Sequence, residues 1–396
     1  MISLKNKAMC CGCEACVSAC PKKCISFNND QEGFGYPSVD LDSCINCGRC
    51  EAVCPIGKAL EIDDLLLAFV GYAYNEETAK KSSSGGVFTA MAKEFLSGGG
   101  IVYGAAFDEN FKLRHIACHN ERELRRITGS KYVQSEIGDS FLQVKADLEQ
   151  KKRVLFSGTP CQIAGLRQFI GENDNLYTVD LICHATPSPL VWKKYNESMR
   201  KKYGGEISRF EFRDKVIGYQ FSHFAIYDRQ SRIIYKAGTF VNQYLRAFFS
   251  GICNRPSCYE CKFKTIKRHS DITLGDCFFS RQFGISDKNG ANTIIVHSEK
   301  GMNLLQSASV KYTAADLDEI VNRHYEITNS AACDERREAF FVDVNAKDID
   351  IVMDEYFPVT IFCLLKYYIR VILKKIGVHD TIKMLYLLVK KNIKKK

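Results

Sequence analysis

Apolar positions between residues 70 and 345 fall into short runs and longer periodic segments that alternate along the chain. The short runs, bounded by turn-forming residues, predict strands at residues 101–107, 113–117, 153–156, 176–183, 207–212, 221–227, 272–274 and 293–297. The longer segments, with apolar residues three or four positions apart, predict helices at residues 87–96, 140–149, 162–169, 190–203, 241–249 and 316–323. This alternation is typical of a mixed α/β domain.

The two ends of the chain follow other patterns. Residues 25–27 and 36–39 flank the turn-rich residues 28–33, which predicts a hairpin, and residues 61–67 predict a short helix or linker. Residues 359–373 mix Phe, Tyr, Leu and Ile with Lys and Arg, and the last segment places on one helical face Ile382, Leu385, Tyr386, Val389 and Ile393. We therefore expect three parts, at residues 1–65, 70–345 and 350–396.

Cysteines in the first part carry the clearest chemical signal. The chain has 19 cysteines, and two runs of the form C-x2-C-x2-C-x3-C-P contain Cys10, Cys13, Cys16, Cys20, Cys44, Cys47, Cys50 and Cys54. Three thiolates at this spacing can take three corners of a 4Fe-4S cubane, and in two-cluster ferredoxins the fourth cysteine of each run ligates the other cluster. We assign one cluster to Cys10, Cys13, Cys16 and Cys54, and the second to Cys44, Cys47, Cys50 and Cys20.

Two other interpretations of these cysteines are weaker. A disulfide framework suits a small secreted domain, but nothing at the start of the chain resembles a signal peptide. Two zinc sites would use only two C-x2-C halves each and leave the other cysteines without a role. The spacing therefore predicts a small ferredoxin-like module in a reducing, cytoplasmic compartment. Cys11 and Cys24 lie outside both runs and are interpreted as bystanders.

The charge distribution argues against nucleic acid as a partner. The formal net charge is +9, and it is concentrated in residues 366–396, where Asp380 is the one acid, so the rest of the chain is close to neutral. No stretch has the roughly 20 apolar residues of a membrane-spanning helix. A basic amphipathic tail suits the inner face of an anionic membrane, to which the protein would be peripheral. The alternative is a tail helix packed on the core with solvated lysines.

A second group of cysteines lies in the α/β part. Cys161 follows a predicted strand at the start of a helix, where the pKa of a thiol is lowered, Cys183 ends another strand, and Cys258 and Cys261 form a C-x2-C pair. If these four converge they can hold a third cluster, with Cys253 and Cys277 in reserve. The alternatives are buried free cysteines and half a zinc site. His184, next to Cys183, is either a structural histidine or a proton donor.

A run of small residues offers a candidate phosphate site. Lys81, Ser83, Ser84, Gly85 and Gly86 lie in the segment KSSSGG just before the helix predicted at residues 87–96. Backbone N–H groups at a helix start carry partial positive charge and bind phosphate. Ordinary capping of the helix by Ser84 explains the same residues, so both interpretations stay open here.

Several motifs together resemble the family of coenzyme F-420 hydrogenase/dehydrogenase beta subunits. They are KSSSGGVF at 81–88, GSKYVQS at 129–135, LFSGTPCQIAGL at 155–166, DLICHATPSP at 180–189, RPSCYECKFK at 255–264 and SDITLGD at 270–276. The resemblance covers about residues 1–340. Two positions depart from the usual family pattern: Ala185 stands where a glycine is common, and Phe278-Phe279-Ser280 replaces an aromatic-glycine ending.

The resemblance implies a flavin-binding domain behind the ferredoxin-like module. FAD contacts are then expected at Lys81, Ser83, Ser84, Gly85 and Gly86, with further pocket residues at Lys131, Tyr132, Gln134, Thr159 and Gln162. The resemblance also favours a third 4Fe-4S cluster at Cys161, Cys183, Cys258 and Cys261. The departures at Ala185 and Phe278 lie where a substrate would approach, so the family's substrate is not carried over.

These features predict an iron-sulfur flavoprotein oxidoreductase of mixed α/β fold. It would pass electrons between ferredoxin, or a similar one-electron donor, and a small organic substrate that takes two electrons. The alternative is an electron-transfer (beta) subunit of a larger hydrogenase/dehydrogenase complex, which could use coenzyme F-420.

Overall fold

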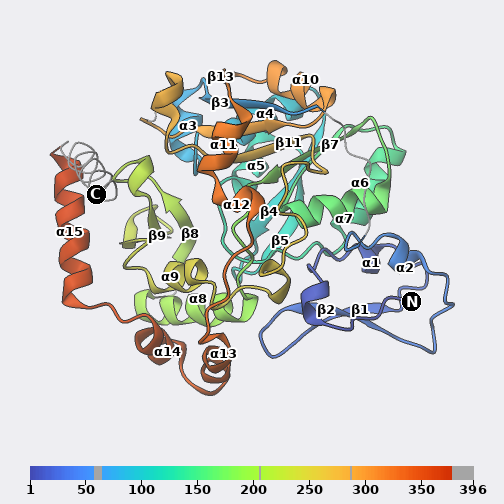
Figure 1. Ribbon diagram of the computed structural model, residues 1–396, viewed down its shortest axis with the longest axis horizontal. Helices are drawn as coiled ribbons and strands as arrows, with labels where there is room; N and C mark the ends of the chain where they lie inside the picture. Colours follow the sequence, from blue (N-terminus) through green and yellow to red (C-terminus); the bar gives the residue numbers. More distant parts are fainter. Residues whose placement is uncertain (58–64, 205–206, 286–287, 377–396) are drawn as a thin grey trace, which may run out of the picture.

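The computed structural model describes residues 1–57, 65–204, 207–285 and 288–376, and within them an eight-stranded mixed sheet forms the centre of the molecule (Figure 1). Its order is β13 (Val310–Ala315), β3 (Leu67–Ala73), β12 (Asn292–Val296), β11 (Ile272–Asp276), β7 (Leu176–Leu181), β6 (Val154–Ser157), β4 (Ile101–Phe107) and β5 (Leu113–Cys118). The inner strands β11, β7, β6 and β4 are parallel, and the pairs outside them are antiparallel.

Helices cover both faces of this sheet, as parallel strands require. One face packs against α4 (Val87–Ser97), α5 (Glu121–Ile127) and α10 (Glu299–Ser307). The other face packs against α6 (Ser140–Glu149) and α7 (Pro160–Ile170) at one end and α11 (Leu317–Arg323) and α12 (Tyr325–Thr328) at the other. The short α3 (Glu76–Lys81) precedes α4.

A second, aromatic core lies beside the central sheet. The antiparallel strands β8 (Ile207–Asp214), β9 (His223–Asp228) and β10 (Ile233–Gly238) form a three-stranded sheet in the order β10-β9-β8. It packs with α8 (Pro189–Tyr203), α9 (Gln243–Ser250), α13 (Arg337–Ala346) and α14 (Ile349–Tyr356). Trp192, Tyr195, Phe212 and Tyr244 are fully buried there and contact one another edge to face or at a tilt.

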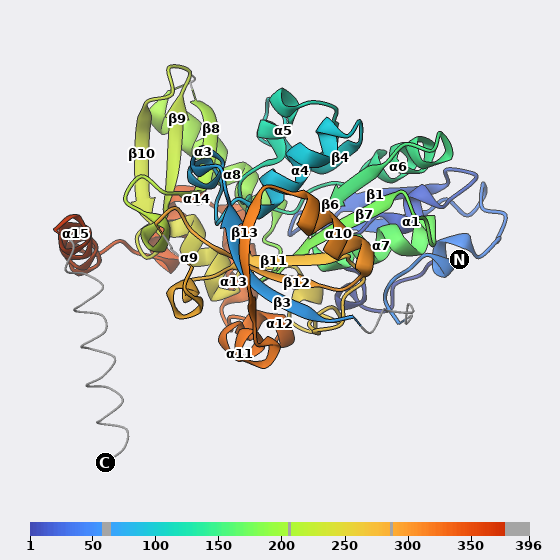
Figure 2. The ribbon, with the colours of Figure 1, turned by 90° about the horizontal axis from the view of Figure 1, so that it is seen from above.

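The N-terminal module is a compact unit at one end of the molecule (Figures 1 and 2). It contains α1 (Ala15–Ser18), the antiparallel hairpin of β1 (Ile25–Asn29) and β2 (Gly35–Val39), and α2 (Arg49–Ala52). The hairpin confirms the one predicted from residues 25–39. Part of the linker predicted at residues 61–67 lies outside the described residues, and Leu67 begins β3.

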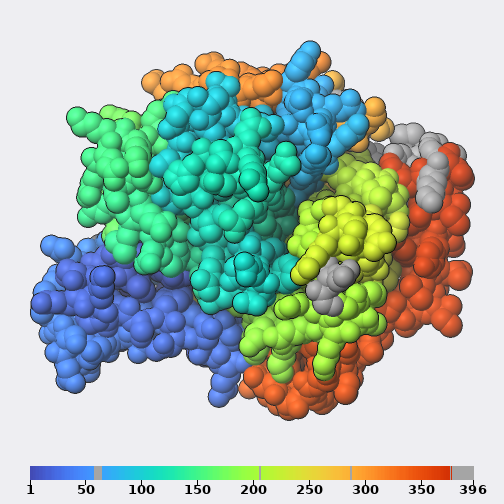
Figure 3. Space-filling view, turned by 180° about the vertical axis from the view of Figure 1, so that it is seen from behind, coloured from blue at the N-terminus to red at the C-terminus, as the bar shows by residue number. Residues whose placement is uncertain are grey.

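Helix α15 (Ile361–Lys375) lies at the opposite end of the molecule (Figure 3). Within the described residues no single helix is long and apolar enough to cross a membrane, and only the pair Ile349–Tyr356 and Ile361–Lys374, bent by 82°, has the length and composition to do so jointly. The face predicted at residues 381–396 lies outside the described part of the chain.

The predicted strands and helices of the α/β part are confirmed in type, with ends that shift by a few residues. The structure also adds strands and helices that periodicity did not indicate, β3, β10 and β13 among the strands and α3, α5, α10, α12, α13 and α14 among the helices. The mixed α/β fold class is thereby confirmed, while flavin binding and a role for the tail remain predictions.

Candidate functional site

The eight cysteines of the N-terminal runs surround two small cavities. Cys10, Cys13, Cys16 and Cys54 line one together with Cys11, and Cys20, Cys44, Cys47 and Cys50 line the other together with Cys24. Each group combines three cysteines of one run with the fourth of the other, which is the grouping of the predicted ligand sets; that these cysteines hold clusters stays a prediction. Gly12 and Gly48 adopt positive φ angles of 73° in the two loops, a conformation that favours glycine.

The two cysteines outside the runs lie next to these groups. The Cys24 thiol is 3.4 Å from that of Cys20. Cys11 lies against both Cys13 and Cys161, and its contact with Cys13, together with burial, raises the pKa of its thiol. Cys11 therefore lies between the first group of cysteines and the α/β domain, a position that the sequence did not indicate.

The N-terminal module is docked closely on the α/β domain. The Glu14 carboxylate accepts hydrogen bonds of 3.0 Å from the backbone N–H groups of Ile137 and Gly138. On the hairpin side, Arg337 of α13 forms a two-pronged ion pair with Glu32. These contacts fix the module at its two ends and position the loop of Cys10 to Cys13 against α7.

The four cysteines predicted in the α/β domain come together from three segments. Cys161 is in the first turn of α7, Cys183 follows β7, and Cys258 and Cys261 lie on and after the short 3-10 helix Pro256–Cys258. Burial raises the pKa of the Cys183 thiol, and the neighbouring Cys258, Cys161 and Cys261 add to this shift, whereas Lys264 opposes it. The four predicted positions are therefore neighbours, while Cys253 and Cys277 are packed in two different hydrophobic clusters.

No three His, Cys, Asp or Glu side chains of the described residues lie close enough together to hold a single metal ion. A four-iron cubane is larger than one ion, so its cysteine sulfurs need to stand farther apart than the ligands of a mononuclear site. The three groups of cysteines fit a cluster in chemistry and number.

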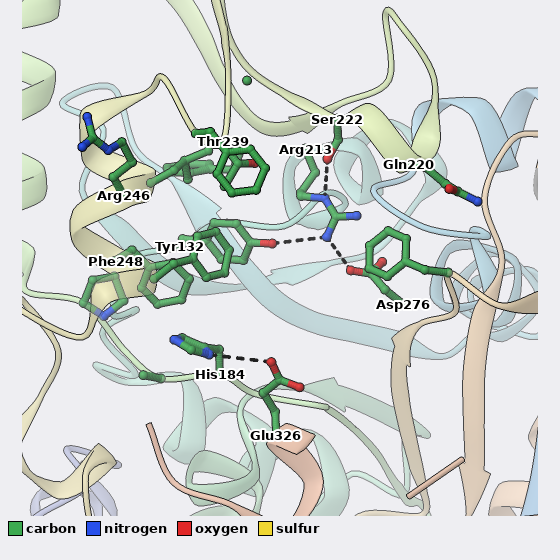
Figure 4. Close-up of a pocket in the computed structure, with 18 of the residues that line it drawn as sticks. Tyr132, His184, Arg213, Gln220, Ser222, Thr239, Arg246, Phe248, Asp276 and Glu326 are labelled. Atoms are coloured by element: carbon green, nitrogen blue, oxygen red, sulfur yellow. Dashed lines mark hydrogen bonds and ion pairs between the residues drawn. The ribbon is translucent and has the colours of Figure 1, made fainter. Parts of the chain in front are cut away.

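A cavity of about 870 Å³ opens beside the four cysteines of the α/β domain (Figure 4). It lies at the carboxyl ends of the parallel strands β7 and β11, where ligands of open α/β sheets commonly bind, and it is enclosed further by the small sheet, α9 and α15. Its volume is in the upper range for ligand pockets. Cys183 and Thr159 belong to its wall, and the Thr159 hydroxyl is 3.2 Å from the Cys161 thiol.

The cavity is lined by aromatic rings and cations. Tyr132 stacks on Phe248 with ring centroids 4.9 Å apart, and Phe278 stacks on Tyr219 at 5.0 Å. The cations that line it are Lys131, Arg213, Arg246, Arg323, Lys366 and Arg370, and the carboxylates are Asp276 and Glu326. This excess of positive charge favours an anionic ligand, and the rings suit a flat one.

Arg213 on β8 is held by three neighbouring side chains of the cavity. Its Nε donates to the Ser222 hydroxyl at 2.9 Å, and its Nη1 contacts the Asp276 carboxylate and the Tyr132 hydroxyl (Figure 4). Its Nη2 is buried and has no hydrogen-bond partner in the described structure. A buried donor without a partner is costly, so this atom is suited to an acceptor on a bound ligand.

His184 also presents an unpartnered nitrogen in the described structure. Its Nδ1 is 3.9 Å from a carboxylate oxygen of Glu326, while its Nε2 is buried without a partner. Phe248 and Phe249 contact the imidazole at 5.1 and 5.4 Å. Burial lowers the pKa of His184, which favours the neutral ring, and a neutral imidazole can donate one hydrogen bond and accept another.

Among the residues proposed for flavin, Lys131, Tyr132 and Thr159 line the cavity. Burial lowers the pKa of Lys131 to about 8, and its ammonium donates to the carbonyls of Thr128 and Gly129. The Gln134 side-chain oxygen accepts a hydrogen bond from Arg255. Gln162 caps α7 and donates a hydrogen bond to the Ser135 hydroxyl.

The KSSSGG segment lies beside the cavity rather than in its wall. The Ser84 hydroxyl donates to the Ala291 carbonyl and contacts Tyr219, while the Ser83 hydroxyl accepts from the Ser130 N–H. A Cβ on Gly85 would meet the Ala291 Cα at 2.9 Å, and Gly86 directly precedes α4 with a φ of 83°. Lys81 pairs with Glu77 at the surface. Of these residues, Ser84 is linked to the cavity wall through Tyr219, whose hydroxyl contacts Asp276.

Sequence reasoning missed Arg213, Asp276, Phe248 and the α15 residues of the cavity. Asp276 ends the motif SDITLGD and could have been suspected from it. The others come from separate elements that only the tertiary structure brings together. The departures at Ala185 and Phe278 both lie in the cavity wall.

Comparisons with known proteins show the family of the chain and the type of its N-terminal domain. Two family models described as those of the coenzyme F420 hydrogenase/dehydrogenase beta subunit match the chain, the N-terminal one at residues 68–140 and the C-terminal one at residues 151–320. Residues 9–58 match a 4Fe-4S dicluster domain. The chain is 20% identical over 307 residues to one of the subunits of F(420)H(2) dehydrogenase from Methanosarcina mazei, covering 74% of this chain and 80% of that protein.

Two further likenesses are more distant or partial. The chain is 24% identical over 337 residues to the coenzyme F420-dependent sulfite reductase of Methanocaldococcus jannaschii, covering 80% of this chain and 48% of that longer protein. A solved chain of the F420-reducing [NiFe] hydrogenase complex from Methanosarcina barkeri aligns with a TM-score of 0.45 and 18% identity, covering 68% of this chain and 90% of that one. On the family matches, the chain belongs to the family of coenzyme F420 hydrogenase/dehydrogenase beta subunits, which are oxidoreductases, with a 4Fe-4S dicluster domain ahead of the family region.

Proposed function

We propose that this protein is an iron-sulfur flavoprotein oxidoreductase that couples a ferredoxin-type electron donor to a small organic substrate. The observation that carries the proposal is the position of Cys183. It belongs both to the group of four cysteines in the α/β domain and to the wall of the cavity. Three groups of cysteines and the cavity thus follow one another through the molecule. When bound, the clusters supply one-electron transfer, and FAD supplies the exchange of single electrons for a hydride.

The cysteines divide into three proposed ligand sets. The first is Cys10, Cys13, Cys16 and Cys54, the second is Cys44, Cys47, Cys50 and Cys20, and the third is Cys161, Cys183, Cys258 and Cys261. Direct contact of Cys11 with Cys161 keeps the first and third sets close together, which favours transfer of electrons between the module and the α/β domain.

In the cavity, Lys131, Tyr132 and Thr159 are proposed to contact FAD, since they lie in its wall. The other residues predicted for FAD are proposed to act around this wall: Ser83, Ser84, Gly85 and Gly86 just before α4, where backbone N–H groups can bind phosphate, and also Gln134, Gln162 and, at the surface, Lys81. Arg213 would bind an anionic group with its free Nη2. His184 is proposed to exchange a proton at Nε2 with the substrate.

A second function is supported by the likeness to a relative that is a subunit of F(420)H(2) dehydrogenase. The chain would then be the electron-transfer subunit of a larger complex, with coenzyme F-420 as a partner. The two proposals differ in what purified protein can do. Turnover by a single species on size exclusion, without an added subunit, supports the stand-alone enzyme, and turnover that requires another chain supports the alternative.

We further propose a cytoplasmic protein that contacts the inner face of a membrane through α15. The outer face of this helix exposes large apolar side chains, among them Ile361 (80%), Leu365 (58%), Ile369 (50%) and Ile372 (57%). The other face contributes Phe362, Lys366, Tyr367 and Arg370 to the cavity wall. A membrane bound to the outer face would therefore lie close to one wall of the cavity.

A matched pair of cysteine variants tests the third ligand set. Cys258→Ser removes a proposed ligand, so anaerobically purified protein should lose about 4 of about 12 iron atoms per chain. Cys253→Ser, five residues earlier in a fully buried apolar cluster, should keep them. Equal iron in the two variants would remove the third cluster from the proposal.

A further inference from the structure

Arg255 lies at the junction between the dicluster module and the α/β domain, and it is fully buried. It immediately precedes the 3-10 helix that carries Cys258. Its Nε donates to the Cys10 carbonyl at 2.7 Å, its Nη2 to the Gly35 carbonyl at 2.8 Å, and its Nη1 to Gln134 at 3.1 Å. One side chain of the α/β domain thus holds both the first cysteine loop and the hairpin of the module.

Residues of the N-terminal module enclose this guanidinium closely. Tyr36 and Phe34 of the module lie against it, with centroids 4.5 and 5.4 Å away. Gly12, which has a φ of 73°, would place a Cβ 2.8 Å from Nη1 of Arg255. The loop between Cys10 and Cys13 is therefore built around the guanidinium.

The charge of Arg255 has no carboxylate to balance it. None of the ion pairs between described residues involves Arg255, and an arginine does not give up its proton in a protein. A buried charge is costly unless an opposite charge lies nearby. Among the described residues, Arg255 therefore has no carboxylate as a direct counter-ion, and another anion beside it would balance its charge.

Cysteine sulfurs occupy the places where that anion is expected. Nη2 of Arg255 is 3.5 Å from the Cys10 sulfur, which belongs to the first proposed set. Arg255 is also tied to the third set through the backbone, because it caps the 3-10 helix Pro256–Cys258 and its carbonyl accepts a hydrogen bond of 2.9 Å from the Cys258 N–H. Thiolates that hold a 4Fe-4S cluster carry net negative charge together with it, so clusters on the two sides would supply the balance.

We propose that Arg255 is a positioning residue that fixes the first and third cluster sites against each other and raises the reduction potentials of the clusters at both. The inference rests on the proposed clusters. A fixed positive charge and a hydrogen bond to a ligand sulfur stabilise the form of a cluster that carries one more negative charge, and this raises its potential. The cluster gains one electron and Arg255 stays protonated throughout, so no proton is needed for this step.

Two substitutions separate the charge of Arg255 from its shape. Arg255→Gln removes the charge and keeps a polar group of similar width. Arg255→Lys keeps the charge and loses the fork that reaches three acceptors at once. The matched control is Arg337→Gln, which breaks another docking contact of the module, the ion pair with Glu32, without removing a group next to the proposed ligand cysteines.

The measurement is an anaerobic redox titration of the reconstituted full-length protein followed by electron paramagnetic resonance, with iron counted for each sample. We expect Arg255→Gln to lower the potentials at the first and third sites by at least a tenfold change in the reduction equilibrium, 59 mV for one electron. Arg255→Lys should stay much closer to the wild type, and Arg337→Gln should leave all potentials unchanged. The set of Cys20, Cys44, Cys47 and Cys50 serves as the internal reference.

Each remaining outcome also decides the question. Unchanged potentials in Arg255→Gln with intact iron would overturn the proposal and leave Arg255 a packing residue. If Arg255→Gln takes up no iron, recovery of the clusters in Arg255→Lys supports the requirement for charge, and failure of both variants overturns it. Failure of the proposed clusters themselves would appear separately, as missing iron in the wild type.

Discussion

Gly165 of α7 faces Cys13 so closely that a Cβ at this position would lie 2.8 Å from the Cys13 sulfur and 2.9 Å from its Cβ. The same helix carries Cys161 in its first turn. The loop that would hold the first cluster thus packs directly against α7, and the first turn of this helix carries Cys161, a proposed ligand of the third cluster. This close approach is the structural reason to treat the module and the α/β domain as one electron path.

Gly165→Ala should therefore disturb the junction even though alanine favours helices. The helical preference of alanine over glycine is worth about 1 kcal/mol, whereas overpacking a close contact costs about 1 to 3 kcal/mol. We expect a lower urea midpoint and loss of iron from the first site. Gly98→Ala is the control, because the atom nearest to its Cβ would be the end of the flexible Arg153 side chain at 3.3 Å, and the next ones, two backbone oxygens, lie at an ordinary 3.7 Å. Equal stability and iron in both variants would contradict the close packing.

Stability should fall in weak acid because of buried histidines. His115 bonds the Ser157 carbonyl through Nε2 and stacks on Phe156, and burial lowers its pKa from 6.5 to about 4. Between these two pH values His115 is protonated in the unfolded chain but not in the folded one. The free energy of unfolding therefore rises with pH. From pH 7.5 to 5.5 this histidine should cost about 1.4 kcal/mol.

Urea unfolding of the iron-free protein at pH 7.5 and 5.5 measures this loss. His115→Gln should remove that part of the pH dependence, and His119→Gln, at an exposed position, should not. A dependence that persists unchanged in His115→Gln would assign it to other groups, such as His297, whose pKa burial lowers to about 3.

Arg213 should control binding of an anionic ligand in the cavity. Its Nη2 has no partner in the described structure, and hydrogen bonds to charged groups are worth about 1.5 to 3 kcal/mol. We expect Arg213→Gln to weaken FAD binding at least tenfold, equivalent to about 1.4 kcal/mol, as measured by quenching of flavin fluorescence. Arg232→Gln, at a side chain that is 72% exposed, is the control. The same FAD affinity in both variants would place the flavin away from Arg213.

The outer face of α15 should bind anionic vesicles. Ile369→Asp and Ile372→Asp place charges on this exposed apolar face and should abolish sedimentation with phosphatidylglycerol vesicles, while phosphatidylcholine vesicles should bind weakly in every case. Ile351→Asp on α14 is the control, since Ile351 is similarly exposed at 53%. If a chain that ends at Phe357 sediments as well as the full chain, the membrane proposal is wrong.

Much of the fold followed from local sequence. Strands such as β4 and helices such as α6 were predicted with their observed ends, since each has clear periodicity and turn residues at both sides. β3 was missed because residues 67–73 are an almost continuous apolar run, which periodicity alone does not distinguish from a helix. β10 and β13 are edge strands, one in each of the two larger sheets. Lysines and alanines in them weaken the alternation of apolar and polar residues that predicts a strand.

The candidate site was predictable where spacing in the sequence fixes spacing in space. The two cysteine runs meet this condition, and so do Cys258 and Cys261. Arg255 and Arg213 do not, because their roles depend on partners such as Cys10 and Asp276, which are 245 and 63 residues away. A cation in the sequence does not reveal whether it will be buried without a carboxylate.

Iron, acid-labile sulfide and flavin per chain, measured in protein purified without oxygen, test the proposed electron path most directly. We predict about 12 iron atoms, as much sulfide and one FAD, which corresponds to three four-iron clusters and an occupied cavity. About 8 iron atoms would confine the clusters to the N-terminal module. Protein without flavin at either iron content would contradict the oxidoreductase proposed here and leave an electron carrier.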